Sequence, residues 1–280
     1  MITERFNDRM VTNDDLIIVN KGEVKHHNDQ AVPHGVLYEL LGHKNGHRVV
    51  REIACNTIVV GGAITALEDL TGATPNWRPS AMNSWHNVPA TPAAGVKPLI
   101  LLYGAGIGGS EDTFGVVNAT SIKQRDVISP IPLRTGASID TDDTSRYFMK
   151  EALQDGTFNW WLKKLAGDPI IKSCWKNAID EDEDGQEITS DIYDDPRDIG
   201  IETFAEFTLD FSEHDMREYF EKIGQTDKAR YNTFGLYTGI PTADGTEYAE
   251  VRLYSVINMN NRSLVEKSRA QYIYRLYALI

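Results

Sequence analysis

The stretch that decides between two fold classes is Lys97–Gly109, which reads KPLILLYGAGIGG. Its apolar run, Leu99–Tyr103, leads into glycines that match the G-x-G-x-x-G pattern of dinucleotide-binding proteins. That pattern holds a pyrophosphate only where a helix begins at the glycines. Residues 110–134 are instead rich in poor helix formers and contain two prolines. We therefore expect a strand that ends in a tight turn at Gly104–Gly109, with a nucleotide-binding loop as the alternative.

The chain is acidic: its 280 residues include 28 Lys and Arg against 41 Asp and Glu, which gives a net charge of −13. An acidic surface repels phosphate groups, so we expect neither nucleic acid nor an anionic membrane as a partner. The longest apolar stretch, Thr57–Leu67, is too short to span a bilayer, and the N-terminus has no apolar signal core. Cys55 and Cys174 have no metal-binding spacing and are expected to be buried thiols of a protein made in a reducing cytoplasm.

The N-terminal third predicts a hairpin followed by a helix. Residues 35–41 and 47–53 flank Asn45-Gly46, a dipeptide that tolerates positive φ and marks a hairpin turn. Thr57–Thr71 then has apolar residues at helical spacing, and Gly72 follows at the position of a C-terminal cap. The side chains expected on its core-facing stripe are Val60, Ala63, Ile64, Leu67 and Leu70.

The middle of the chain is less regular. Residues 73–96 predict a long ordered loop, and Val127–Arg134 predicts an edge strand, because its two prolines cannot donate ladder hydrogen bonds. Residues 144–165 are expected to be helical, with an interruption at Gly156. The candidate buried positions of that helix are Tyr147, Phe148, Leu153, Trp160, Trp161 and Leu165.

The C-terminal part has the clearest strand patterns. Phe207, Leu209 and Phe211 alternate with polar residues, which indicates a half-buried strand, and Ser212 can cap a short helix that runs to Ile223. The last strand is apolar on both faces, so it is central in a sheet or covered by another subunit. The further strands are expected at Arg230–Thr238, Tyr248–Ile257 and Gln271–Ile280.

This order of elements predicts an α+β fold, a mainly antiparallel β-sheet with a few helices packed on it. We expect a single domain over residues 1–280, with the acidic region near residues 165–200 as an insertion.

No catalytic constellation is evident in the sequence. The seven histidines have no metal-ligand spacing, no serine lies in G-x-S-x-G, and no cysteine has an activating motif nearby. We therefore expect no catalytic residue and no cofactor. Trp160 and Trp161, with Trp77 and Trp85, have the chemistry to stack on sugars. Adjacent tryptophans on a helix point in different directions, however, which favours a role in the core.

One acidic loop partly matches a calcium-binding pattern. Asp180, Asp182 and Asp184 are carboxylates at alternate positions followed by a glycine, as at the start of an EF-hand loop, and Asp191 falls at the twelfth position. The match is incomplete, because the twelfth residue is Asp rather than Glu and Pro196 disfavours an exiting helix. The first three aspartates are candidate metal ligands, and a solvated acidic loop is the default interpretation.

Several short segments occur in a distinctive order. Asn56–Gly62 opens the apolar helix; Leu101–Gly106 and Pro130–Arg134 come next, and Phe207–Phe211 and Asn232–Thr238 come before the two last strands. This order resembles a group of tailed-bacteriophage virion proteins, described as tail, baseplate, collar or fibre-associated structural proteins. The resemblance spans about residues 35–135 and 203–280, and the acidic region departs from it. The family has no catalytic residues to carry over.

The resemblance implies a non-enzymatic structural component of the virion, in the neck or collar, the tail or the baseplate. Such a protein is made in the host cytoplasm, is located in the virion, and assembles with other virion proteins as a homo-oligomer in a symmetric ring. The two-sided last strand is the expected interface, with Tyr277 and Leu279 as contact residues. The alternative is a host-surface glycan-binding or depolymerase protein that uses the Trp-rich loops.

Overall fold

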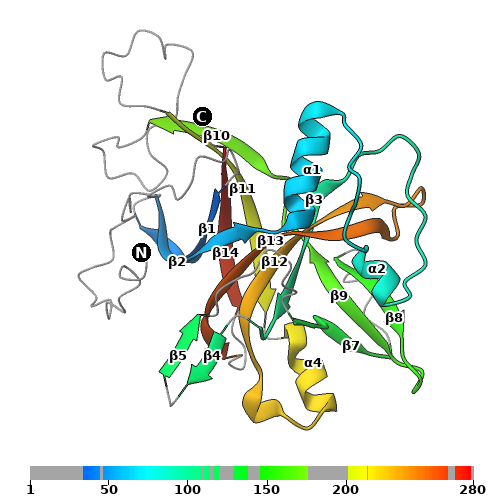
Figure 1. Ribbon diagram of the computed structural model, residues 1–280. Coiled ribbons are helices and arrows are strands. Elements are labelled where there is room, and N and C mark those ends of the chain that lie inside the picture. Colours follow the sequence, from blue (N-terminus) through cyan, green and yellow to red (C-terminus); the bar gives the residue numbers. More distant parts are fainter. Residues whose placement is uncertain are drawn as a thin grey trace.

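The structure is a computed structural model that describes residues 34–44, 47–108, 110–113, 116–119, 129–137, 146–175, 201–212, 214–263 and 269–278. In these residues the strands form a twelve-stranded sheet and a separate two-stranded sheet (Figure 1). All the strand pairs described are antiparallel, and helices pack on the large sheet. The predicted α+β fold, mainly antiparallel sheet, is confirmed.

The elements have the following bounds. The large sheet contains β1 (His34–Lys44), β2 (His47–Ile58), β3 (Leu99–Gly106), β6 (Pro130–Ile131), β7 (Arg134–Gly136), β8 (Tyr147–Ala152), β9 (Phe158–Lys164), β10 (Ile170–Trp175), β11 (Ile201–Ser212), β12 (Arg230–Pro241), β13 (Tyr248–Ser263) and β14 (Arg269–Ala278). The small sheet contains β4 (Ser110–Thr113) and β5 (Val116–Ala119), and the helices are α1 (Val60–Thr71), α2 (Met82–Trp85) and α4 (His214–Lys222), with a 3-10 turn, η2 (Thr226–Lys228). The order along the large sheet is β10-β11-β14-β1-β2-β13-β12-β3-β9-β7, with β6 beside β3 and β8 beside β9.

The large sheet curls so that strands far apart in its order meet. Just after β9, the backbone N–H of Ala166 donates to the carbonyl of Thr208 in β11 at 3.0 Å. The Asp210 carbonyl of β11 accepts two further hydrogen bonds, from the Tyr103 hydroxyl of β3 at 2.6 Å and from the Lys163 ammonium of β9 at 2.7 Å. The end of the sheet that contains β11 is therefore fastened to β3 and β9.

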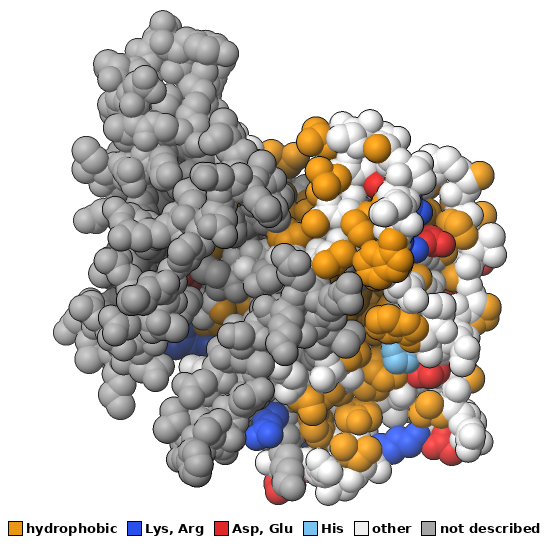
Figure 2. All heavy atoms as spheres, viewed as in Figure 1, with side chains coloured by type: hydrophobic (Ala, Val, Ile, Leu, Met, Phe, Trp, Pro, Cys, Tyr) orange, Lys and Arg blue, Asp and Glu red, His pale blue; other side chains and the backbone are white. Residues whose placement is uncertain are grey.

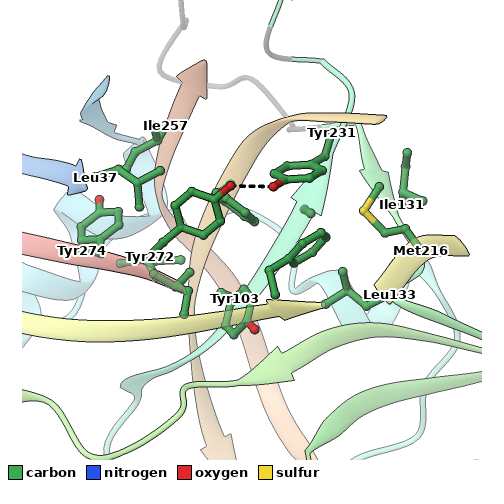
Figure 3. Packing of buried hydrophobic residues seen from close by; sticks show 14 of the residues in the cluster. Leu37, Tyr103, Ile131, Leu133, Met216, Tyr231, Ile257, Tyr272 and Tyr274 are labelled. Atoms are coloured by element: carbon green, nitrogen blue, oxygen red, sulfur yellow. Dashed lines mark hydrogen bonds between the residues drawn. The ribbon is translucent and has the colours of Figure 1, made fainter. Parts of the chain in front are cut away.

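The enclosed face of the curled sheet holds the largest core cluster, which Figure 3 shows in part. Its buried side chains come from most strands of the sheet and from α4. The hydroxyls of Tyr231 and Tyr272, which face each other inside it, hydrogen-bond at 2.6 Å (Figure 3). A second cluster lies on the opposite face of β3, β12 and β13, where the segment that contains α1 and α2 covers Leu102, Tyr237 and Val256.

The N-terminal hairpin and the C-terminal strands are confirmed. β1 pairs with β2 from Lys44↔His47 onward, around the predicted Asn45-Gly46 turn, whose own residues lie outside the described part. In β11 the side chains of Phe207, Leu209 and Phe211 are buried, as the alternation predicts, but the strand is not half-buried, because Glu206 and Asp210 on its other face are buried as well. β14 lies between β11 and β1, so the two-sided apolar strand is central in the sheet.

β3 continues through Gly104 to Gly106, so the predicted start of the turn at Gly104 is wrong. The prediction that no helix begins at these glycines is confirmed for the described residues 104–108 and 110–113, and Gly109 lies outside the described part. Gly104 serves close packing instead, because a Cβ at this position would lie 2.9 Å from Cδ2 of Leu162 and 3.2 Å from Cε2 of Tyr237. The glycine lets β3 pass directly beneath these two side chains.

The predicted helix forms, but its start and its buried face differ from the prediction. α1 begins at Val60 because the residues up to Ile58 belong to β2, and Gly72 caps its C-terminus at φ 67°. The predicted core residues Leu67 and Leu70 are 60% and 82% exposed. The buried side of α1 carries Gly61 and Gly62 instead.

The two glycines explain why α1 is turned this way. A Cβ on Gly62 would lie 2.1 Å from the carbonyl oxygen of Tyr254 in β13, and one on Gly61 would lie 2.9 Å from that of Leu253. The same Tyr254 carbonyl accepts a hydrogen bond from the N–H of Val59 at 3.1 Å. The first turn of the helix therefore lies directly on the sheet backbone, and its leucines point elsewhere.

The predicted helix over residues 144–165 is wrong as well. β8 and β9 form a hairpin there, with Gly156 at φ 82° in the connection, where a left-handed residue is needed. The expected burial holds for Tyr147, Phe148 and Trp160, and for Leu165 just after the hairpin. Aromatic residues favour strands, so cross-strand packing outweighs the weak helical spacing.

The remaining expectations are met in part. The loop of residues 73–96 is ordered and includes the short helix α2. The edge strand predicted at Val127–Arg134 is divided into β6 and β7, and its first two residues lie outside the described part. α4 is present. The region expected to be an insertion begins with β10, which pairs with β11, while residues 176–200 lie outside the described part.

Polar residues on the other face of β11 are buried in ion pairs. Glu206 lies 3.1 Å from Arg275 of β14 and 2.8 Å from Arg48 of β2. Burial alone raises the pKa of Glu206, but Arg48, Arg275 and the nearby Lys172 together lower it below its ordinary value.

Gly62→Ala is expected to lower the free energy of unfolding by about 1–3 kcal/mol, because the added methyl group collides with the Tyr254 carbonyl. Gly167→Ala is the matched control, since a Cβ at this position meets no atom within 4 Å. Urea denaturation of both variants measures the difference. Equal stability of the two variants would show that α1 does not rest on the sheet through this glycine.

Glu206→Gln is expected to lower the free energy of unfolding at pH 7 by about 3 kcal/mol, because it removes the carboxylate that pairs with the buried Arg275. The pKa of Glu206 is lower in the folded state, so its contribution is complete above pH 4.5 and is lost as the pH falls through the folded-state pKa. The difference in the free energy of unfolding between wild type and Glu206→Gln should therefore become smaller as the pH falls toward 3. Chemical denaturation from pH 7 to pH 3 measures this difference, with the exposed Glu221→Gln as control. A difference that does not change with pH would contradict the stabilising role of the Glu206 carboxylate.

Candidate functional site

The predicted site residues fall into two groups. Asp180, Asp182, Asp184 and Leu279 lie outside the described residues, so the calcium loop and half of the predicted interface remain predictions. Tyr277 is half-buried, with its ring centroid 5.2 Å from that of Phe204. On the same face of β14, Ile273 and Arg275 are buried. The described part of this face is therefore covered, and Tyr277 lies at its end.

The four tryptophans considered as possible sugar-binding residues differ in their burial. Trp160 is buried in the core, as expected, and the ring of Trp161 stacks on His86 with a centroid separation of 4.0 Å. Trp77 and Trp85 are 51% and 55% exposed, which the core interpretation does not account for. Among the described residues, no group of three or more His, Cys, Asp or Glu side chains is arranged to hold a metal ion.

The first candidate site is the exposed apolar side of α1. It presents Leu67 and Leu70, and we call it the α1 surface. Trp77, Val96 and Leu99 are exposed apolar residues of the segments that flank the helix. Ion pairs fix these segments to the helix: Arg78 pairs with Glu68, and Lys97 lies 3.6 Å from Asp69. Figure 2 shows hydrophobic side chains gathered over the region that α1 occupies in Figure 1. Exposed groups of large apolar residues often mark sites where a protein contacts another molecule, whereas apolar residues scattered singly do not.

A second apolar feature lies on β10. Ile170 and Ile171 are 56% and 75% exposed, and neighbouring residues of a strand point to opposite faces. Both faces of β10 are therefore open at this point. In the described part of the chain β10 pairs with β11 alone, at the end of the sheet. An apolar strand in this position is suited to contact with another chain.

The third feature is a cavity of about 400 Å³ beside α1. It lies between the helix, the ends of β12 and β13, and the two segments that flank the helix. Its lining is Gly61, Ile64, Thr65, Glu68, Asp69, Gly72, Ala73, Thr74, Arg78, Pro79, Lys97, Pro98, Thr238, Ile240, Glu250 and Arg252.

The charges of the cavity cancel in three ion pairs. Two of them are Glu68–Arg78 and Asp69–Lys97, described above, and the third joins Glu250 to Arg252. Arg252 also donates from Nε to the Pro79 carbonyl at 3.1 Å. Glu250 has a φ of 55°, a left-handed conformation that is unfavourable for a residue other than glycine. The arrangement offers hydrogen-bond donors and acceptors side by side with no excess charge.

Neither the α1 surface nor the cavity could be predicted from a local sequence pattern. The helical spacing of Leu67 and Leu70 is visible in the sequence, but spacing alone does not tell which side of a helix faces the sheet. The cavity residues come from four separate segments, so no motif connects them. No pattern in the sequence predicts the left-handed backbone conformation of Glu250.

In comparisons with known proteins, no family model, no curated protein and no solved structure matches the chain. In the part of the chain that the structure describes, no helix is long and apolar enough to cross a membrane.

Leu67→Ala and Leu70→Ala are expected to change the free energy of unfolding by less than about 0.5 kcal/mol, because both side chains are exposed. Leu37→Ala is the control, since Leu37 is fully buried and its truncation should cost about 2–5 kcal/mol. Chemical denaturation of the three variants tests this. A cost at Leu67 similar to that at Leu37 would mean that the α1 surface is covered within the folded chain.

Proposed function

We propose that this protein is a non-enzymatic structural component of a bacteriophage virion and acts by assembly with copies of itself and with other virion proteins. The observation that carries the proposal is the orientation of α1. The helix rests on the sheet through Gly61 and Gly62 and directs Leu67 and Leu70 outward. An apolar helix face turned away from its own core gains stability only when a partner covers it.

Two different apolar features favour assembly into a ring. The α1 surface and the exposed isoleucines of β10 belong to different elements, so a contact between them joins unlike surfaces of two copies. Contacts between unlike surfaces close into rings when the rotation between neighbours allows it. The net charge of −13 supports a partner that is a protein rather than nucleic acid or an anionic membrane. The order of sequence segments that resembles virion proteins supports the same assignment.

Tyr277 and Leu279 remain a second proposed contact of the same assembly. Tyr277 is half-buried at the end of β14, where its ring packs on Phe204. Because Ile273 and Arg275 are already buried on that face, the α1 surface offers more exposed apolar area than the described part of β14.

A second candidate function, host-surface glycan binding, is favoured by one observation. Trp77 and Trp85 are about half exposed, and aromatic rings that are open to solvent can stack on sugars. Trp77 directly precedes Arg78, which lines the cavity beside α1.

Leu70→Asp is expected to abolish self-association of the purified chain while leaving its stability unchanged, because it places a charge in an apolar contact. Sedimentation velocity measures the oligomeric state, and denaturation measures the stability. Ile223→Asp is the matched control, since Ile223 is an exposed apolar residue that directly follows another helix, α4.

The same two variants, encoded in a phage genome that carries this chain, test the assignment to a virion. We expect particles to form with Ile223→Asp and to fail with Leu70→Asp. A wild-type chain that stays monomeric at high concentration, and particles that assemble normally with Leu70→Asp, would contradict assembly through the α1 surface.

A further inference from the structure

The cavity beside α1 is built from rigidly positioned parts. α1 forms one wall and is held on the sheet by its glycines, and β12 and β13 contribute Thr238, Glu250 and Arg252. Its volume of about 400 Å³ lies within the range of small-molecule sites, about 300–1,000 Å³. The cavity can therefore accept a small ligand with little rearrangement.

The charges of the lining favour a neutral ligand. Each of the three carboxylates that line the cavity pairs with a cation that also lines it. An anionic or cationic ligand would therefore meet a like charge directly beside the opposite charge that attracts it. A neutral ligand avoids that repulsion.

The same pairs suit a ligand with many hydroxyl groups. A hydroxyl both donates and accepts hydrogen bonds, so it can accept from a guanidinium or ammonium group and donate to the neighbouring carboxylate. The Lys97 ammonium and the Asp69 carboxylate are 3.6 Å apart, longer than a direct hydrogen bond, so a hydroxyl can bridge them. The hydroxyl groups of Thr65 and Thr74 add further polar contacts.

A β-bulge at the cavity positions one of its carboxylates. Glu250 lies in β13 between the buried residues Ala249 and Val251, and its φ of 55° is left-handed. The pairing of β12 with β13 shifts register here, between Thr238↔Arg252 and Ile240↔Ala249, and left-handed residues occur at such bulges. The bulge supplies the carboxylate that pairs with Arg252 in the lining.

We propose that this cavity binds a neutral polyhydroxylated ligand, the chemical class of a saccharide unit. This inference rests on the second candidate function, glycan binding, and is independent of virion assembly. It assigns the binding to the cavity and its ion pairs rather than to the exposed tryptophans alone.

The test is saturation-transfer NMR of the full chain with methyl glycosides of glucose, galactose and N-acetylglucosamine, followed by titration of any sugar that binds. Lys97→Met and Asp69→Asn change two exposed groups of the cavity and should leave the fold intact, which thermal unfolding checks. We expect each to weaken binding about tenfold. Lys222→Met and Asp155→Asn are matched controls, because they break an exposed ion pair outside the cavity, and they should bind as wild type.

The other outcomes overturn the proposal in distinguishable ways. Sugar binding that survives Lys97→Met and Asp69→Asn but is lost in Trp85→Ala would keep glycan binding and remove it from the cavity. No saturation transfer from any of the sugars would overturn both the cavity site and glycan binding. Displacement of the bound sugar by inorganic phosphate would identify an anion site and contradict the preference for a neutral ligand.

Discussion

The buried ammonium group of Lys163 joins strands that lie near opposite ends of the sheet. From β9 it donates to the Asp210 carbonyl of β11 at 2.7 Å and to the Asp215 carboxylate of α4 at 2.9 Å. The other oxygen of Asp215 accepts the Tyr147 hydroxyl at 2.7 Å. Burial lowers the pKa of Lys163, although the Asp215 carboxylate opposes that effect. A buried charge is tolerated only with its partners in place, so β9, β11 and α4 have to meet in one register, and the curl of the sheet follows.

The curl has consequences for both faces of the sheet. Inside it, aromatic rings such as Tyr103, Phe234 and Tyr272 fill the core at close range. Outside it, α1 approaches β13 so closely that only glycine fits at the contact. This close approach turns the leucines of α1 outward and, with the loops that its ion pairs hold, leaves the polar cavity at its side. The proposed contact surface and the proposed ligand site therefore have the same origin.

Much of the sheet is predictable from local sequence. The Asn45-Gly46 dipeptide, the alternation at Phe207–Phe211 and the apolar faces of the last three strands each indicate a strand or hairpin that the structure contains. Gly72 likewise indicates the end of α1. Local patterns fail where packing reverses them: the weak helical spacing of residues 144–165 gives way to the β8–β9 hairpin, because its aromatic residues pair across strands.

The sequence by itself determined the fold class, the hairpin, the position of α1 and the strands that follow Phe207, because strand alternation, turn dipeptides and glycine caps act over a few neighbouring residues. Only the tertiary structure decided which side of α1 is buried, that Gly104 serves packing instead of a turn, and that six charged residues from separate segments pair around one cavity. The orientation of α1, the packing at Gly104 and the gathering of four segments around the cavity each depend on contacts between parts of the chain that are remote in sequence. Steric contact with the Tyr254 carbonyl, rather than hydrophobicity, set the orientation of the helix.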